Sequence, residues 1–324
     1  MHSTLRARSS FNRRIPEGSP EPEQDALALA LLPRYQLVRA IGSGAMGSVF
    51  LARDTLLHCM VAIKAIRPEY ARMAEWRARF LREARLGAQL DHPGIVSVQD
   101  IVQSGAVIAI VMPYAGTSAG ALVREHGALP EVEARAILIA AAEALAFVHG
   151  RGVVHRDVKP DNILISRERD TRRIRLSDFG IASLPHAGSE SASAPAGSPA
   201  FMAPEQLLDH LDAGPRSDIY ALGVVGYFLL TGALPFEGES IHAILARKLE
   251  EDYVPIRVRA SKVSQGLAGA IERCLAAAPE ARWPGARAFR AGLEVKTRSR
   301  GRKLREWLAN LYSGSGPVAH EARA

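Results

Sequence analysis

Cysteines and long apolar runs are scarce in this sequence of 324 residues, and each absence excludes a class of protein. The two cysteines, Cys59 and Cys274, lie far apart and match no spacing of metal ligands, so neither a disulfide scaffold nor a zinc site is predicted. Two buried thiols in a reducing compartment are predicted instead, and the cytoplasm is the predicted location. The longest apolar runs, such as residues 219–230, are shorter than the roughly 20 residues that span a bilayer.

Acidic residues are absent from two basic segments, one near each end of the chain. The net charge is +7, and residues 1–14 and 295–305 together carry 10 of the 41 basic side chains without one acid. The remaining 31 basic side chains stand against 34 acidic ones, so the body of the chain is nearly neutral. These tails are either solvated segments or contacts for an acidic surface, such as nucleic acid or an anionic membrane. No nucleic-acid-binding domain is recognisable elsewhere.

Strand-like patterns dominate the first third of the chain. Residues 1–33 are rich in Ser, Pro, Arg and Glu and predict a flexible extension, whose apolar stretch 26–32 is expected to pack on the edge of the domain. Short β-branched runs bounded by turn residues then predict strands. They lie at residues 35–42, 48–53, 61–66, 95–102 and 106–114. Helical spacing over residues 75–90 predicts one main helix between them.

Beyond Gly116 the pattern is mostly helical. Apolar residues lie nearly all round the segments 130–149, 217–232 and 266–278, which predicts helices buried inside a domain. The predicted fold class is therefore α+β, with a small β-rich lobe and a larger, mostly helical lobe. The small lobe, the connector, the large lobe and a basic tail are predicted at residues 34–112, 113–118, 119–294 and 295–324.

A glycine-rich stretch lies between the first two predicted strands. Gly42, Gly44 and Gly47 follow the spacing G-x-G-x-x-G. A dinucleotide-binding fold has the same spacing but needs a helix at the third glycine, whereas a strand pattern follows here. The glycines are therefore expected at the end of a β-hairpin, where backbone N–H groups can approach phosphate oxygens closely. A glycine-rich hairpin without a ligand is the alternative.

Polar side chains crowd into the segment HRDVKPDNIL at 155–164, more than a polar turn between strands would need. This crowd is one of six motifs in a fixed order. They are the glycine loop, VAIK at 61–64, Glu83, HRDVKPDN at 155–162, DFG at 178–180 and APE at 203–205. Over residues 35–294 the set resembles a eukaryotic-type serine/threonine protein kinase, most like the bacterial members of that family. The resemblance implies the bilobal protein-kinase fold.

The resemblance implies that ATP binds together with Mg²⁺ or Mn²⁺. Lys64 is implied to contact the α- and β-phosphates and to form an ion pair with Glu83 from the helix. Asp178 and Asn162 are the implied metal ligands, since oxygen donors suit these ions.

The resemblance also assigns the residues of phosphoryl transfer to protein substrates. Asp157 is implied to orient the acceptor hydroxyl and to take its proton, a role worth about 10²–10⁴ in rate. Lys159 is implied to neutralise the γ-phosphate, and its placement resembles serine/threonine rather than tyrosine kinases. The segment 155–164 is then a catalytic loop that holds a base, a cation and a metal ligand.

Apolar residues and the glycine loop are implied to surround the nucleotide. The set comprises Ile41, Gly42, Gly44, Gly47, Val49, Ala62, Lys64, Met112, Pro113, Ala115 and Leu164. Met112 is implied at the rear of the adenine pocket, although a plain packing role also explains it. Pro113 lacks an N–H, but the family uses only the carbonyl group there, and Ala115 is implied to donate the N–H to adenine.

The segment 181–202 is implied to be an activation loop. It contains Ser189, Ser191 and Ser193, and a phosphate on one of them is expected to pair with Arg156 and order the loop. Such autophosphorylation brings two copies together, so a kinase dimer is a predicted partner state. An unmodified linker is the alternative.

Four further residues match the family with little change. Ser198 replaces a threonine that is usual in the family, and its hydroxyl still suits a bridge to the catalytic loop. Glu205 and Arg282 match a buried ion pair, and Asp218 matches a residue that holds the loop backbone. The last three are predicted to be scaffold.

Gly87 departs from the family, which usually has a leucine at this position. Glycine predicts a gap beside Phe179 and a helix that is looser by about 1 kcal/mol.

The residues favour one of three functions. A protein serine/threonine kinase needs a lysine, a base and metal ligands, and all are present. A pseudokinase scaffold, which binds nucleotide or partners without turnover, usually lacks at least one of them. A kinase of small molecules is disfavoured by the APE segment and by a loop suited to peptides.

Overall fold

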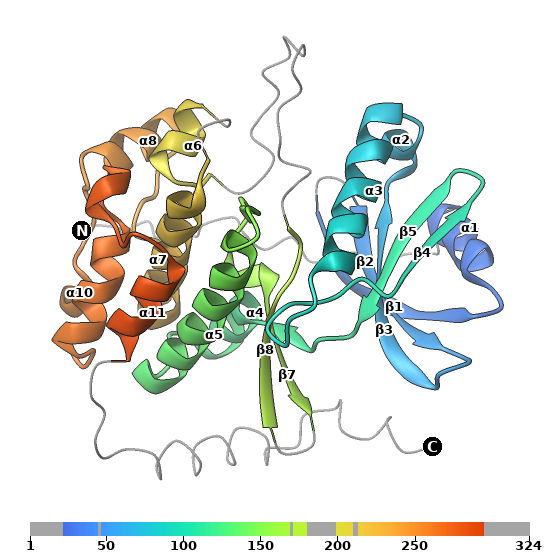
Figure 1. Cartoon of the computed structure of the whole chain (residues 1–324), viewed down its shortest axis with the longest axis horizontal. Coiled ribbons are helices and arrows are strands. Elements are labelled where there is room, and N and C mark those ends of the chain that lie inside the picture. The colour runs from blue at the N-terminus through green and yellow to red at the C-terminus, as the bar shows by residue number, and fades with distance from the viewer. Residues whose placement is uncertain (1–21, 45–46, 169–170, 180–198, 210–212, 295–324) are drawn as a thin grey trace, which may run out of the picture.

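The computed structural model describes residues 22–44, 47–168, 171–179, 199–209 and 213–294. Within them the chain forms a small lobe built on a sheet and a larger lobe of helices (Figure 1). The predicted bilobal α+β fold class is confirmed. In these ranges, no helix is both long and apolar enough to cross a membrane.

The sheet of the small lobe is antiparallel, with the strand order β1-β2-β3-β5-β4. Its strands are β1 (Tyr35–Ser43), β2 (Gly47–Asp54), β3 (Cys59–Ile66), β4 (Asp100–Ser104) and β5 (Val107–Pro113). The helices of this lobe are α1 (Pro22–Leu31), α2 (Pro68–Ala71) and α3 (Ala74–Gln89). The hairpins and the main helix α3 follow the predicted pattern.

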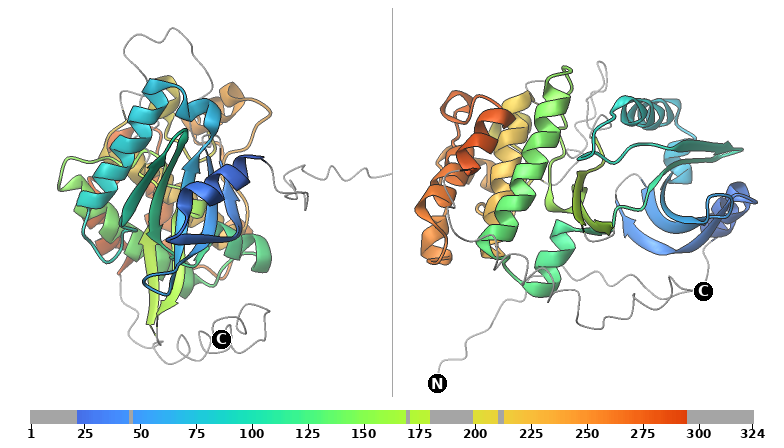
Figure 2. Two further views of the ribbon diagram at one scale, coloured as in Figure 1. Left: turned by 90° about the vertical axis from the view of Figure 1, so that its right-hand side faces the viewer. Right: turned by 60° about the horizontal axis from the view of Figure 1, so that its bottom comes forward.

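The helices α1 and α3 cover opposite faces of this sheet. Ile108 and Ile110 of β5 join the cluster under α3, whereas Ala109 and Val111 join the cluster under α1. The two sets alternate because successive side chains of a strand point to opposite faces. Figure 2 shows the two helices on either side of the strands.

The helix α1 corrects the prediction of a flexible extension for residues 22–31, whereas the expectation that the apolar stretch 26–32 packs on the domain is confirmed. Leu27 and Leu31 are 4% and 2% exposed and pack in one cluster with Tyr35 and Phe50. This burial stabilises the helix, so the chain from residue 22 onward belongs to the small lobe.

The connector between the lobes follows β7 closely. Its strand β6 (Thr117–Ser118) pairs with β7 (Ile163–Glu168), which pairs in turn with β8 (Thr171–Leu176). Gly116 has a φ of +85°, and a Cβ there would lie 2.1 Å from the carbonyl oxygen of Ile165. Only glycine therefore allows the connector to approach β7 this closely.

The large lobe is mostly helical, as predicted. The α-helices described in it are α4 (Ala119–His126), α5 (Glu131–His149), α6 (Pro204–Leu208), α7 (Pro215–Thr231), α8 (Ile241–Leu249), α9 (Ile256–Arg259), α10 (Gln265–Cys274) and α11 (Ala286–Leu293). Short 3-10 turns are η1 (Pro160–Asn162) and η4 (Pro279–Ala281).

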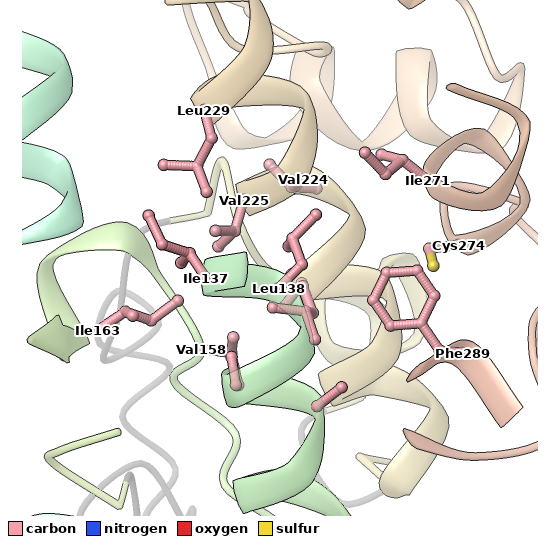
Figure 3. Close-up of a cluster of buried hydrophobic side chains, with 14 of the residues drawn as sticks. Ile137, Leu138, Val158, Ile163, Val224, Val225, Leu229, Ile271, Cys274 and Phe289 are labelled. Carbon is pink, nitrogen blue, oxygen red and sulfur yellow. The ribbon is translucent and has the colours of Figure 1, made fainter. Parts of the chain in front are cut away.

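One continuous core fills the large lobe (Figure 3). Ile137 of α5, Val224 of α7 and Phe289 of α11 meet in it, and all are fully buried. Val158 reaches the same core and is 1% exposed. Because Val158 lies in the middle of the polar segment 155–162, its burial anchors that segment to the core of the large lobe.

The strand predicted over residues 95–102 is shifted toward the C-terminus in the structure. β4 begins at Asp100, and Ile95 instead forms an isolated parallel bridge with Leu176. The N–H of Val96 donates to the carbonyl oxygen of Leu176 at 2.9 Å. This stretch therefore ties the small lobe to the large one. Residues 153–154, which directly precede the polar segment 155–164, form no strand.

Candidate active site

The glycine loop is a hairpin between β1 and β2, as predicted. The N–H of Gly44 donates to the carbonyl oxygen of Gly47 at 2.8 Å. A Cβ on Gly47 would lie 2.1 Å from the carbonyl oxygen of Ala65, so β3 leaves room only for glycine. A Cβ on Gly42 or Gly44 would come no closer than 3.9 Å to its described neighbours. Packing does not require these two glycines, and their backbone can face a ligand.

Lys64 forms two ion pairs, one within the small lobe and one that joins it to the large lobe. Its Nζ atom lies 2.7 Å from Oε1 of Glu83 on α3 and 2.8 Å from Oδ1 of Asp178 in the large lobe. Burial alone lowers the pKa of Lys64, but the two carboxylates raise it above its ordinary value, so the ammonium stays charged. Burial opposes the charge of Asp178, yet the ammonium holds the pKa of this carboxyl below its usual value. Burial raises the pKa of Glu83, which shares the ammonium with Asp178.

Asp218 on α7 holds the backbone of the polar segment. Its two carboxylate oxygens accept hydrogen bonds from the N–H groups of His155 and Arg156, both at 2.8 Å. Arg156 has a φ of +68°, and Asp178 has a φ of +55°. Residues other than glycine rarely adopt this left-handed conformation, and it persists only where surrounding bonds impose it. Asp218 therefore imposes the turn that presents the next residue, Asp157.

Asp157 has one carboxylate oxygen engaged and one available. Its Oδ2 atom accepts hydrogen bonds from Nζ of Lys159 at 2.6 Å and from Nδ2 of Asn162 at 3.0 Å. Nδ2 of Asn162 also donates to the carbonyl oxygen of Asp157 at 2.8 Å. In the described part of the chain Oδ1 has no partner. This arrangement fixes the carboxylate and leaves one acceptor for another hydroxyl.

His155 connects the polar segment 155–162 with the segment that contains Ser177 and Asp178. Sequence reasoning gave this histidine no role. It is fully buried, its Nε2 atom donates to the carbonyl oxygen of Ser177 at 3.0 Å, and Nδ1 accepts from the N–H of Asp157 at 3.3 Å. These partners require a neutral ring, and burial lowers the pKa of His155 accordingly. Its ring centroid lies 4.7 Å from that of Phe179. The histidine at the start of the HRD motif was the signal for this role.

Asn162 and Asp178 lie on adjoining segments. The carbonyl oxygen of Asn162 accepts from the N–H of Ser177 at 2.9 Å, and the Oδ1 atom of Asn162 has no partner among the described residues. The described residues hold no cluster of three or more His, Cys, Asp or Glu that could bind a metal. This donor set fits Mg²⁺, which binds through one or two carboxylates together with phosphates rather than in a protein cage.

The residues implied around adenine come from both lobes. Ile41 and Val49 lie on the β1–β2 hairpin, Ala62 on β3, Met112 and Pro113 at the end of β5, Ala115 in the connector and Leu164 on β7. Ala62 is paired with Met112 across β3 and β5. Met112 also packs against the cluster that contains Phe80, so its packing role is real. These residues thus come from strands of the small lobe, from the connector and from a strand of the large lobe.

The comparisons identify the family of this site. The protein kinase domain family matches residues 35–291. This chain belongs to the protein kinase family. The serine/threonine-protein kinase PknB of Mycobacterium leprae is 39% identical over 274 residues, which cover 81% of this chain and 43% of that relative. The serine/threonine-protein kinase PrkC of Bacillus subtilis is 41% identical over 221 residues, which cover 68% of this chain and 34% of that relative.

Solved structures agree with the family assignment. The crystal structure of the Mycobacterium tuberculosis PknI kinase domain has a TM-score of 0.60 and 31% identity, and the match covers 80% of this chain and 95% of that one. The predicted family is confirmed: residues 35–291 form a protein kinase domain. The chain spans less than half the length of the curated relatives PknB and PrkC.

The kinase domain contains the predicted buried ion pair between Glu205 and Arg282. Nη1 and Nη2 of Arg282 donate to Oε1 and Oε2 of Glu205 at 2.7 and 2.9 Å, and Arg282 is 1% exposed. Gln206 was missed by sequence reasoning. Its Nε2 atom donates to the carbonyl oxygen of Arg156 at 3.3 Å, and it thereby links α6 to the catalytic loop.

The gap predicted beside Gly87 of the kinase domain is absent, and this prediction was wrong. A Cβ on Gly87 would lie 2.9 Å from Cγ2 of Val98, so Val98 occupies the space that a larger side chain would need. Phe179 is 3% exposed and packs in the core of the large lobe.

The predicted phosphorylation sites lie outside the described residues. These sites are Ser189, Ser191 and Ser193, and Ser198 and both basic tails lie outside the described residues as well.

Proposed function

We propose that this chain is an ATP-dependent serine/threonine protein kinase that transfers the γ-phosphate of ATP to hydroxyl groups of protein substrates. One observation carries the proposal: three separate segments converge on a single polar site. Lys64 contacts Asp178 directly, and Asn162 connects the segment of Asp178 with the carboxylate of Asp157. Phosphoryl transfer needs this kind of positioning and charge neutralisation more than covalent help.

The small lobe binds the phosphoryl donor. The Lys64 ammonium contacts the α- and β-phosphates, and Glu83 keeps it oriented. The backbone of Gly42 and Gly44 faces the phosphates because no side chain intervenes. Apolar residues of both lobes enclose the adenine. This part of the site carries no reacting group of its own.

Asp178 and Asn162 would hold Mg²⁺ or Mn²⁺. The bound cation supplies neutralisation of the charge on the phosphate oxygens. Lys64 keeps Asp178 ionised and hence ready to serve as a ligand.

The large lobe binds the acceptor and handles its proton. The acceptor hydroxyl donates a hydrogen bond to the available Oδ1 atom of Asp157, which directs the hydroxyl oxygen toward the γ-phosphate. As the new O–P bond forms, the bond between the γ-phosphorus and the β–γ bridging oxygen breaks, ADP leaves with the electron pair of that bond, and the proton of the hydroxyl passes to this carboxylate. Lys159 and Asn162 hold the other oxygen, so the base cannot rotate away. Lys159 also offsets the negative charge of the transferring group.

The direct test is transfer of radiolabelled phosphate from ATP to a generic basic protein. The wild type should label serine or threonine, and Asp157→Asn should lose activity by about 10²–10⁴. Asp161→Asn is the matched control, because its carboxylate contacts Arg124 at 2.8 Å and takes no part in the proposed transfer. A wild type that binds ATP without transfer would favour the pseudokinase alternative. The presence of Lys64, Asp157 and both metal ligands speaks against that alternative.

We also propose three features of the kinase that concern its surroundings. It phosphorylates its own activation loop within residues 189–193. Mass spectrometry after incubation with ATP and Mg²⁺ tests this, and an unmodified loop in active enzyme would contradict it.

The basic tails of the kinase contact an acidic surface. The kinase acts in the cytoplasm, where ATP is supplied and where thiols stay reduced; the thiol of Cys274 is buried as predicted, whereas that of Cys59 is exposed.

Autophosphorylation further requires that two copies meet. Leu32, Leu56 and Leu57 support such a contact, because each is more than half exposed at the outer end of the small lobe. They are neighbours, since Thr55 beside them donates from its hydroxyl to the carbonyl oxygen of Pro33 at 3.0 Å. Sedimentation of Leu57→Glu should show weaker self-association than the wild type. Unchanged association would exclude this surface.

A further inference from the structure

Lys248 is a buried lysine that the proposed catalytic steps do not use. It lies on α8 and is fully buried. No carboxylate forms an ion pair with its ammonium in the described part of the chain. A buried charge without such a partner calls for another reason to be there.

The ammonium of Lys248 is directed at one short turn of the backbone. Its Nζ atom donates to the carbonyl oxygen of Ala200 at 2.9 Å and to that of Met202 at 2.5 Å. The rings of Tyr220 and Phe236 enclose it, with centroids 5.1 and 5.7 Å away. Two directed hydrogen bonds and two aromatic faces thus replace a carboxylate.

Stability of the core does not explain this ammonium. Burial lowers the pKa of Lys248 to about 7, although the charge of Glu205 raises it, and Arg282 lowers it further. A methionine would fill the same space between Tyr220 and Phe236 without burying a charge. Methionine, however, has no N–H group that could donate to the two carbonyl oxygens of the turn.

The turn held by this lysine, residues 199–203, lies against the catalytic loop. The N–H of Ala203 donates to Oε1 of Gln206 at 3.0 Å, and Nε2 of Gln206 donates to the carbonyl oxygen of Arg156 at 3.3 Å. Arg156 directly precedes Asp157. A polypeptide whose hydroxyl reaches Asp157 must therefore pass close to this turn.

We propose that Lys248 is a positioning residue for the protein substrate. By holding the carbonyl groups of Ala200 and Met202 inward, it fixes the outer surface of the turn 199–203, on which the acceptor polypeptide lies. This inference rests on the proposed kinase function. The nucleotide contacts come from other segments, so Lys248 should affect the use of the protein substrate and leave the use of ATP unchanged.

The test compares Lys248→Met, Lys248→Gln and the wild type. Lys248→Met removes the donors and should lower kcat/KM for a generic basic protein by about 10-fold to 100-fold. Lys248→Gln keeps an N–H donor group and should recover most of that loss. The KM for ATP and the rate of ATP hydrolysis without acceptor should stay unchanged in both. Arg247→Met is the matched control: it lies one residue earlier on the same helix, half exposed, and should behave like the wild type.

Each outcome decides the inference. A selective loss with protein substrate, recovered by glutamine, supports it. An equal loss of ATP hydrolysis and protein phosphorylation, or no loss at all, overturns it. If neither variant folds, Lys248 is a structural residue and the inference is also overturned. A wild type without phosphate transfer would instead refute the proposed function, and the two failures are therefore distinguishable.

Discussion

The catalytic loop packs against one continuous core in the large lobe. Lys64 and Glu83 instead belong to the small lobe, whose core is divided into two small clusters on opposite faces of a sheet. Bonds from Asp218 fix the backbone of the loop, and Val158 anchors it in the core. The ammonium of Lys64, oriented by Glu83, connects the small lobe to Asp178 through one ion pair.

This difference separates the two tasks of the site. The base Asp157 needs one fixed orientation, and buried hydrogen bonds supply it. The cation Lys64 must accept new partners when phosphates enter, and the phosphate oxygens then compensate for weakened contacts with its carboxylates. Substitutions in the core of the large lobe should therefore change stability most, whereas substitutions around Lys64 should change activity more than stability.

Among the substitutions that compare the two lobes, Lys64→Met should have the largest effect, and the effect should be on activity. Removing the ammonium takes away a charge that faces the phosphates, with an expected loss of about 10²–10³ in kcat. The melting temperature should fall moderately, because two carboxylates lose their cation while the core of the large lobe is untouched. Lys262→Met, at an exposed position, is the matched control. A melting temperature that collapses together with activity would break the comparison between the lobes.

Ile137→Ala should have the largest effect on stability. Ile137 is fully buried in the core of the large lobe, and its truncation should lower the free energy of unfolding by about 2–5 kcal/mol. Leu27→Ala in the small lobe should fall at the lower end of that range, because α1 covers only one cluster. Denaturation in urea measures both. Equal losses would show that the two lobes do not differ in this way.

The pH dependence of the free energy of unfolding should reveal the lowered pKa of Lys248. Its pKa of about 7 in the folded chain lies below the ordinary 10.5, so between these values the unfolded chain binds more protons. The free energy of unfolding of the wild type, relative to Lys248→Met, should therefore rise with pH by about 1 kcal/mol per unit in this window. Urea denaturation at several pH values measures it. Parallel curves for the two proteins would mean that the pKa of Lys248 is not lowered.

Gly87→Ala should have the smallest effect. Alanine favours the helix by about 1 kcal/mol, but its Cβ would lie 2.9 Å from Cγ2 of Val98. The two effects should nearly cancel in the free energy of unfolding, while a shift of α3 moves Glu83 and lowers kcat a few-fold. The double variant Gly87→Ala with Val98→Ala should restore kcat. Wild-type activity in Gly87→Ala alone would show that this contact does not position α3.

Long helices and motif order were predictable from the sequence. The prediction of a helix over residues 75–90 matches α3, and the prediction over 130–149 matches α5, because helical periodicity is a local property. The contact between Lys64 and Glu83 followed from the order of the motifs. These features need no knowledge of distant packing.

Contacts between distant segments were not predictable in the same way. The segment of α1 begins with proline and acids, a helix-start signal, but the polar composition before it concealed the helix. That Val98 fills the space beside Gly87 depends on where the chain before β4 runs. The hydrogen bonds of Lys248 join residues 46 and 48 positions apart, and no local pattern indicates them.

A crystal structure with a non-hydrolysable ATP analogue and Mg²⁺ tests the central claim most directly. We expect the phosphates beside Lys64, the cation on Asn162 and Asp178, and a catalytic loop whose backbone is unchanged. A nucleotide bound elsewhere, or a loop that refolds around it, would contradict a preformed catalytic loop completed by a single ammonium from the small lobe.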